Sequence, residues 1–303
     1  MKHLLPLLML AAPSLMAQTP QVSSGKIEVI PISLSAFIAP RDVYVWLPDG
    51  YNPGKRYSVL YMHDGQMLFD ANITWNKQEW GVDEWLGWMI PDGSIQPCIV
   101  VGISNIPEIR HYEYAPQKAF SYLTEEDIAL IRSGEQQRSY ELDSLRGDKY
   151  LRFLVEELKP MIDARYATLP DRGHTFIAGS SMGGLISMYA MCEYPQVFGG
   201  TACLSTHWPG IFRADNNPVG AAFLQYFEEH IPAPGNNRWY FDYGTATLDA
   251  LYEPFQLQAD AILKAAGYNA TNWATGKFEG DDHSENAWRA RLQYPLMFLL
   301  GIE

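Results

Sequence analysis

The stretch His174-Thr175-Phe176-Ile177-Ala178-Gly179-Ser180-Ser181-Met182-Gly183-Gly184 decides both the fold and the chemistry expected of this chain. The apolar run ending at Ala178 predicts a buried strand, and the run from Gly184 to Cys192 predicts a helix. Between them, residues 179–183 match G-x-S-x-G with Ser181 as the central serine, the pattern of a tight turn that holds a serine hydroxyl above a sheet. A glycine-rich turn that only packs closely is the alternative, but the flanking strand and helix favour a nucleophile.

Short apolar runs alternate with helical patterns along the rest of the chain. The runs at 57–62, 98–103, 175–178, 201–204 and 238–243 predict strands, as does the polar–apolar alternation at 42–47, and 273–278 is the expected last strand. The patterns at 150–165, 185–193, 254–266 and 286–300 predict helices. Such alternation predicts an α/β fold, a mostly parallel central sheet with helices on both faces. No linker divides residues 18–303, so we expect a single domain, with the more polar segment 105–148 as a candidate insertion over the active site.

Composition excludes several classes of protein. The chain has 303 residues, 47% of them hydrophobic, which allows a large core and excludes a disordered chain. Its net charge of −13 argues against binding nucleic acid, because neutralising phosphates requires a basic face. The three cysteines, Cys98, Cys192 and Cys203, lie in or beside apolar segments and lack zinc-site spacing, so we expect buried thiols and no metal.

The first residues predict export. Lys2 and His3 precede a mostly apolar run that ends near Ala17, a small residue suited to signal cleavage. The run is too short, and too interrupted by Pro6 and Pro13, for a membrane-spanning helix. Residues 1–17 are therefore interpreted as a signal peptide, with a periplasmic or extracellular mature protein that has no membrane span.

A serine nucleophile needs a histidine base, and in hydrolases of this architecture the base follows the serine in the chain. The histidines after Ser181 are His207, His230 and His283. His230 is expected at a helix end, and His207 is expected at the rim of the site. His283 follows the expected last strand and precedes the final helix, so it is the predicted base.

The acid that orients this histidine is expected after the strand at 238–243. Asp242, Asp249 and Glu253 are the candidates. Asp242 falls within the strand, and Glu253 is expected to open the next helix. Asp249 lies in the intervening loop and is preferred, with Asp242 as the alternative.

The oxyanion of an acyl-transfer intermediate needs two amide donors. The amide of Met182, directly after the serine, is one. The other is expected in the loop after the strand at 57–62, where Gly65 allows close approach and the amide of Gln66 is the preferred donor. His63, in the same loop, is interpreted as structural.

Together these motifs resemble the “Putative esterase” family of α/β hydrolases, which includes esterase D, enterochelin esterase-like enzymes, feruloyl and acetylxylan esterases and mycolyltransferases. The resemblance covers most of residues 40–300 and is carried by the segments 61–66, 80–84, 99–103, 178–184, 195–199 and 204–205. It implies an α/β-hydrolase fold with Ser181 as nucleophile, His283 as base and the amides of Gln66 and Met182 as the oxyanion hole. Members of the family often place the acid soon after a Gly-Thr pair, which is Gly244-Thr245 here.

Aromatic residues provide a weaker indication of the substrate. Asp64, Arg110 and Trp208 are the candidate substrate-binding residues, and of these Arg110 and Trp208 are expected in loops above the sheet. Trp85 and Trp88 are instead expected in the core, on a helical stripe with Val82 and Met89. The sequence thus predicts an exported serine carboxylic-ester hydrolase without a cofactor, acting through an acyl-enzyme on an ester of a carbohydrate or small alcohol. An acyltransferase or a non-catalytic carbohydrate-binding protein on the same scaffold is the alternative.

Overall fold

The computed structural model describes residues 19–133, 141–211 and 217–302, and the predicted signal peptide lies outside these ranges. The described residues form an eight-stranded sheet in the order β1-β2-β4-β3-β5-β6-β7-β8. The strands are β1 (Lys26–Ile32), β2 (Arg41–Leu47), β3 (Ser58–His63), β4 (Cys98–Ile103), β5 (Thr175–Ser180), β6 (Gly200–Leu204), β7 (Arg238–Gly244) and β8 (Trp273–Phe278). β2 pairs antiparallel with both β1 and β4, and every other neighbouring pair is parallel, so the sheet is mostly parallel, as expected.

The central strands are buried along their whole length, because helices cover both faces of the sheet. Every residue of β3, β4, β5 and β6 is buried. Successive residues of a strand point to opposite faces. In β3, Val59 and Tyr61 therefore join one hydrophobic cluster while Leu60 and Met62 join the other. This two-sided burial explains why these strands are continuous apolar runs in the sequence.

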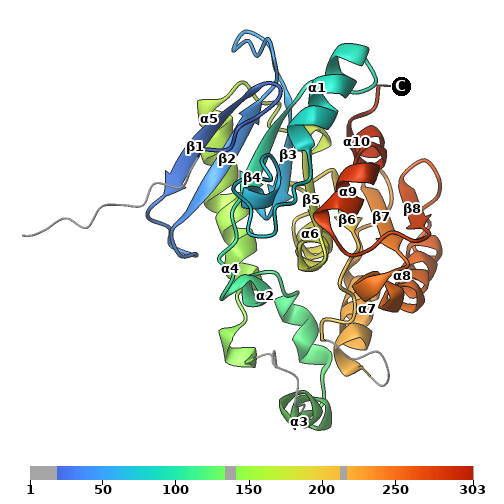
Figure 1. Ribbon diagram of the computed structural model, residues 1–303. Helices are drawn as coiled ribbons and strands as arrows, with labels where there is room; N and C mark the ends of the chain where they lie inside the picture. The colour runs from blue at the N-terminus through green and yellow to red at the C-terminus, as the bar shows by residue number, and fades with distance from the viewer. Residues whose placement is uncertain (1–18, 134–140, 212–216, 303) are drawn as a thin grey trace, which may run out of the picture.

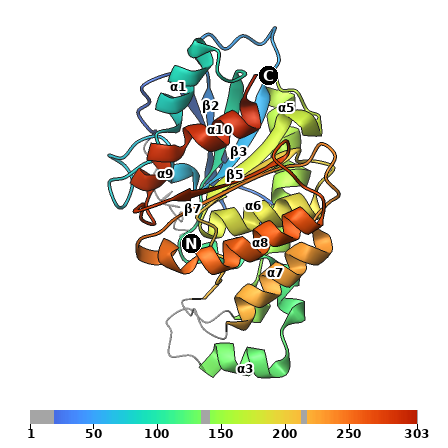
Figure 2. The same cartoon turned by 90° about the vertical axis from the view of Figure 1, so that its right-hand side faces the viewer.

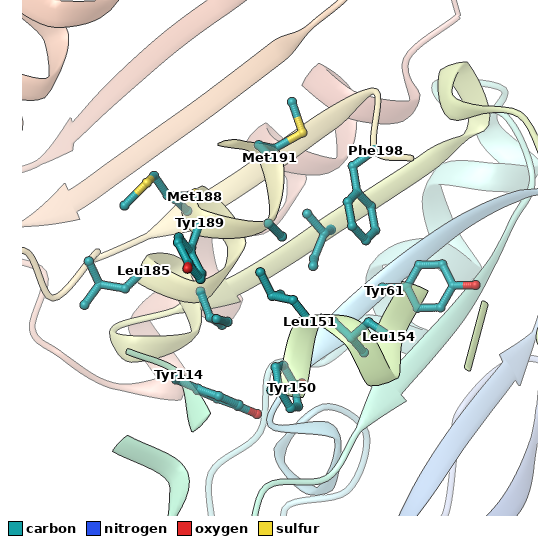
Figure 3. Packing of buried hydrophobic residues seen from close by; sticks show 14 of the residues in the cluster. Tyr61, Tyr114, Tyr150, Leu151, Leu154, Leu185, Met188, Tyr189, Met191 and Phe198 are labelled. Carbon is teal, nitrogen blue, oxygen red and sulfur yellow. The ribbon is translucent and has the colours of Figure 1, made fainter. Parts of the chain in front are cut away.

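Two layers of helices complete the core (Figures 1 and 2). One face carries α1 (Val82–Asp92), α9 (Glu285–Arg291) and α10 (Gln293–Leu300). The other face carries α4 (Gly147–Arg152), the π-helical turn η4 (Phe153–Leu158), α5 (Lys159–Arg165), α6 (Met182–Glu193), α7 (Pro218–His230) and α8 (Glu253–Ala265). Figure 3 shows Tyr61 of β3 at one end of this cluster, with Phe198 and Leu154 as its nearest labelled neighbours and Leu185 at the opposite end.

The described parts of the segment 105–148, residues 105–133 and 141–148, extend beyond the carboxyl ends of the parallel strands (Figure 1). Its described elements are α2 (Arg110–Glu113), η2 (Gln117–Tyr122), α3 (Glu125–Ser133) and η3 (Leu142–Ser144). A buried ion pair joins it to the sheet, because Arg41 of β2 donates to both carboxylate oxygens of Glu113 at 2.8 and 2.6 Å. Other short turns are η1 (Gly65–Met67), η5 (Arg172–His174) and η6 (Thr247–Leu251).

All seven expected strands are present, and β1 is an additional strand that the sequence patterns did not indicate. The expectation for Trp88 was wrong, since its side chain is 60% exposed. Helix α1 buries Val82, Leu86 and Met89 against the sheet and turns Trp88 outward. Cys98 and Cys203 are buried free thiols as expected, while Cys192 is a free thiol that is only partly buried.

Candidate active site

Ser181 lies in the sharp turn between β5 and α6, in a strained backbone conformation. Its φ of 58° and ψ of −121° lie in a region that residues with a side chain rarely adopt. The turn requires glycine, because a Cβ at Gly179 would lie 2.8 Å from the backbone carbon of Gly183. The amide of Ser181 donates to the carbonyl of Leu204 at 2.9 Å, which ties the turn to β6.

His283 and Asp249 come together from the loops after β8 and β7. Nδ1 of His283 lies 2.5 Å from Oδ1 of Asp249. The Asp249 side chain is completely buried, whereas that of His283 is 16% exposed and lines a cleft together with Ser181. Thr247 fixes the histidine backbone, since its hydroxyl accepts a hydrogen bond from the His283 amide at 2.9 Å. The predicted base and the preferred acid are therefore in hydrogen-bonding contact.

The other two acid candidates lie elsewhere. Asp242 is fully buried within β7, where its Oδ1 accepts a hydrogen bond from Arg291 at 3.0 Å. Burial raises the pKa of Asp242 despite this arginine. Glu253 is the first residue of α8, as expected, and its carboxylate pairs with Lys277 at 2.9 Å.

The two predicted oxyanion donors both lie at the start of a helix. Met182 is the first residue of α6, and Gln66 is the second residue of η1. Gln66 lines the same cleft as Ser181 and His283. The Gln66 side chain is held by the loop after β4, because its Oε1 accepts from the Asn105 amide at 3.1 Å.

Asp64 and Arg110 form one rigid unit in the wall of this cleft. Nε and Nη2 of Arg110 donate to the two carboxylate oxygens of Asp64, both at 2.7 Å, and Asn105 donates to Oδ1 at 2.6 Å. The guanidinium also lies over the ring of Tyr114, 5.0 Å from its centroid. Burial alone would raise the pKa of Asp64, but Arg110 and Asn105 outweigh it and hold the pKa below its usual value. Arg110 lines the cleft that contains Ser181 and His283.

Trp208 is the clear correction to the predicted site. We expected it in a surface loop, but its side chain is completely buried. Nε1 donates to Gln256 at 2.9 Å, and the ring packs against Phe227 and Phe241. Helices α7 and α8 cover the residues after β6, so this tryptophan belongs to the core. The exposed aromatic residue at the cleft is Trp75, which is 85% exposed.

The remaining histidines near the site are buried. Nδ1 of His63 lies 2.8 Å from the hydroxyl of Tyr150, consistent with the structural role that the sequence suggested. His207 was expected at the rim but is 4% exposed, with Nδ1 2.9 Å from the hydroxyl of Tyr252. Burial lowers the pKa of each of these two histidines to about 3, so both are neutral at ordinary pH.

Four residues around Asp249 and His283 were missed by sequence reasoning: Ser205, Tyr252, Trp288 and Arg291. Ser205 donates to Oδ2 of Asp249 at 2.5 Å. The rings of Tyr252 and Trp288 both stand edge-on to His283, at centroid distances of 5.7 and 5.1 Å. Ser205 lies in a segment of the family resemblance to which no role was assigned, and no motif identifies the other three, because the four become neighbours only when β6, α9 and the residue before α8 pack together.

The cleft has a volume of about 830 Å³. Its lining combines tryptophan rings with polar side chains: Asp64, Gln66, Trp75, Asn76, Gln78, Trp80, Asn105, Arg110, Glu285 and Trp288. Among the described residues, no group of three or more His, Cys, Asp or Glu side chains is arranged to hold a metal ion. None of the helices in the described ranges has the length and apolar character needed to cross a membrane.

Comparison with known proteins identifies the family. A family model described as “Putative esterase” matches residues 35–299. The chain belongs to this esterase family. An endo-1,4-beta-xylanase/feruloyl esterase from Xylanibacter ruminicola is 26% identical over 262 residues, which are 82% of this chain and 28% of that protein. The chain spans less than two thirds of the length of the curated relatives it matches.

Solved esterase structures share the fold of this chain. A ferulic acid esterase superposes with a TM-score of 0.61 at 18% identity, over 91% of this chain and 98% of that one. The enterobactin esterase of Shigella flexneri, solved in the presence of enterobactin, gives a TM-score of 0.67 at 17% identity, over 92% of this chain and 60% of that one. The expected α/β-hydrolase fold is therefore confirmed.

Proposed function

We propose that this protein is a serine carboxylic-ester hydrolase in which Ser181 is the nucleophile, His283 the base and Asp249 the acid. The observation that carries the proposal is the 2.5 Å contact between His283 and Asp249, because this histidine lines the cleft that also contains Ser181 on its strained turn. A serine hydroxyl is a weak nucleophile on its own and needs such an oriented imidazole. Membership of the esterase family supports the same reaction class.

The proposed reaction proceeds in two steps. Oγ of Ser181 attacks the ester carbonyl while Nε2 of His283 takes the hydroxyl proton. The amides of Gln66 and Met182 donate to the carbonyl oxygen as it becomes negative. The tetrahedral intermediate then collapses, the alcohol leaves with the proton from His283, and an acyl-enzyme remains on Ser181.

Water completes the cycle by the same route. His283 takes a proton from water as the hydroxide attacks the acyl carbonyl, and the released acid leaves Ser181 with its proton restored. Asp249 accepts the hydrogen bond from Nδ1 of His283 and stabilises the imidazolium that forms in each step.

For the substrate, we propose an ester of a carbohydrate or of a small alcohol. The cleft supports this because it combines exposed indole surface at Trp75 with fixed polar groups at Asn105 and Arg110. Aromatic faces suit the apolar faces of sugars and aromatic acids, and fixed polar groups orient hydroxyls. The name of the Xylanibacter ruminicola relative, a xylanase/feruloyl esterase, points in the same direction.

We also propose that the protein is exported and that residues 1–17 are removed, on the evidence of the sequence pattern alone. Intact-mass measurement of the protein recovered outside the cytoplasm tests this proposal. A mass that includes residues 1–17 would contradict it.

Hydrolysis of p-nitrophenyl acetate tests the catalytic proposal. Ser181→Ala should reduce kcat/KM by at least about 10³-fold, because the nucleophile is removed while the amide donors remain. Circular dichroism of the variant should match the unaltered protein. Undiminished turnover by a folded Ser181→Ala variant would show that another group performs the chemistry.

A further inference from the structure

Ser205 makes three hydrogen bonds that use the full capacity of its hydroxyl. Its Oγ lies 2.5 Å from Oδ2 of Asp249, 2.9 Å from Nε1 of Trp288 and 2.9 Å from Nη2 of Arg291. A serine hydroxyl has one proton to donate and two lone pairs that accept. The indole and guanidinium nitrogens can only donate, so they occupy the two lone pairs. The single Ser205 proton must therefore point to Asp249.

The surroundings of Ser205 prevent it from turning away. The residue is completely buried, and its φ of 42° is held by an amide hydrogen bond to the Asp242 carbonyl at 2.7 Å. Arg291 is equally fixed, because it also contacts Oδ1 of Asp242 at 3.0 Å and Oδ2 of Asp281 at 2.9 Å. Its guanidinium is 1% exposed and lies 3.9 Å from Asp249 Oδ2.

Asp249 is consequently held at both carboxylate oxygens. Oδ2 accepts from Ser205 and from the amide of Gly244 at 2.6 Å, which leaves Oδ1 to face His283. Because an ionised carboxylate can only accept, the proton in the contact with His283 belongs to Nδ1, and Nε2 is left as the acceptor.

We propose that Ser205 is a positioning residue for the reaction, which fixes the Asp249 carboxylate and, through it, the orientation and tautomer of His283. This inference rests on the proposed function, since it assigns Ser205 a task only if His283 acts as the base. Ser205 is buried and touches Asp249 but not the imidazole, so it acts through the carboxylate.

The test compares Ser205→Ala with Thr168→Val, both assayed with p-nitrophenyl acetate. Thr168 is the matched control, because its buried hydroxyl also donates to a carboxylate, that of Asp163 at 2.7 Å. It pairs with Tyr57 just before the start of β3, whereas the site lies beyond the end of that strand. Ser205→Ala should lower kcat by about 10- to 100-fold, the factor that one hydrogen bond to a charged group corresponds to, with KM unchanged. Thr168→Val should leave kcat and KM unchanged.

A proton NMR measurement separates positioning from a loss of stability. The low-field resonance of the His283–Asp249 hydrogen bond, identified by its absence in His283→Gln, should shift or disappear in Ser205→Ala and persist in Thr168→Val. A folded Ser205→Ala variant with unchanged kcat and resonance overturns the inference. If Ser205→Ala does not fold, Ser205→Cys, with a weaker donor of similar size, decides by the same two readouts.

The outcome for Ser181→Ala keeps the two proposals apart. If Ser181→Ala is inactive and Ser205→Ala is fully active, only the role of Ser205 fails. If Ser181→Ala is itself active, the proposed function fails first.

Discussion

At the residue scale, the site depends on a few side chains that burial and hydrogen bonds hold in fixed positions. Ser181 is kept in a strained conformation by the packing of β5 and α6. Asp249 is kept in place by donors on both of its carboxylate oxygens. Local strain and full hydrogen bonding are both typical of positions where geometry matters more than stability.

The choice between the two candidate acids gives a prediction at this scale. Asp249→Asn should lower kcat/KM for p-nitrophenyl acetate by about 10³-fold or more, because the amide no longer selects the Nδ1–H tautomer of His283. Asp242→Asn should lower kcat/KM by at most about tenfold, since Asp242 contacts Arg291 and not the histidine. Steady-state kinetics of both variants decide the assignment. A larger loss in Asp242→Asn would transfer the role of the acid to that residue.

At the element scale, the segment 105–148 is joined to the sheet by a buried charge pair. Glu113 of α2 and Arg41 of β2 are both 1% exposed at their side chains. Glu113 and Arg110 belong to the same short helix, α2, and Arg110 lines the cleft, so the Arg41–Glu113 pair links the sheet to the cleft wall. Breaking it should therefore affect both folding stability and the cleft.

Glu113→Gln should destabilise the protein by about 3–5 kcal/mol, because it leaves the Arg41 charge buried without its partner. Urea unfolding at pH 7 measures the loss. The matched control is Glu156→Gln, which removes an exposed charge pair with Arg152 on one helical stretch and should change stability little. Equal effects of the two substitutions would contradict the account of the buried pair.

The elements also show what the sequence could predict. β4 was expected at 98–103 and occupies those residues, because an apolar run between turn residues is a local signal. β1 was missed, since Pro31 and the mixed polarity of its residues weaken the strand pattern and its pairing with β2 is not local. The exposure of Trp88 depends on which face of α1 packs on the sheet. The spacing of the apolar residues alone did not determine that face.

At the scale of the whole molecule, the order of Ser181, Asp249 and His283 in the sequence predicted which side chains meet at one edge of the sheet. The carboxyl ends of parallel strands bring loops far apart in the chain together. Ser205 could not be predicted in the same way, because its partners Trp288 and Arg291 are 83 and 86 residues away. The predicted surface position of Trp208 was wrong for the same reason, since its burial depends on α7 and α8, two helices later in the chain.

Buried neutral histidines make the stability of the whole molecule depend on pH. The pKa of His63 is lowered to about 3, mainly by burial, from an unfolded value near 6.5. Below pH 6.5 the unfolded chain binds a proton at His63 that the folded protein does not bind. The free energy of unfolding is therefore unaffected by protonation of His63 above pH 6.5 and decreases as the pH falls from 6.5 towards 3. The loss is about 1.4 kcal/mol per pH unit.

His63→Asn removes this titration. The variant should be less stable than the unaltered protein at pH 7.5, because buried packing is lost, but the difference should shrink by about 2 kcal/mol at pH 5. Urea unfolding at the two pH values measures it. A stability difference that does not change with pH would mean that His63 titrates alike in the folded and unfolded chain.

The central claim, that the His283–Asp249 pair activates Ser181, is tested most directly by labelling with a fluorophosphonate. The account predicts one phosphonyl group per chain, attached to Oγ of Ser181 in the peptide identified by mass spectrometry. Fluoride leaves the reagent, and His283 takes the hydroxyl proton of Ser181. Ser181→Ala should not be labelled, and His283→Gln should be labelled far more slowly. Attachment to another residue, or equally fast labelling of His283→Gln, would contradict the claim.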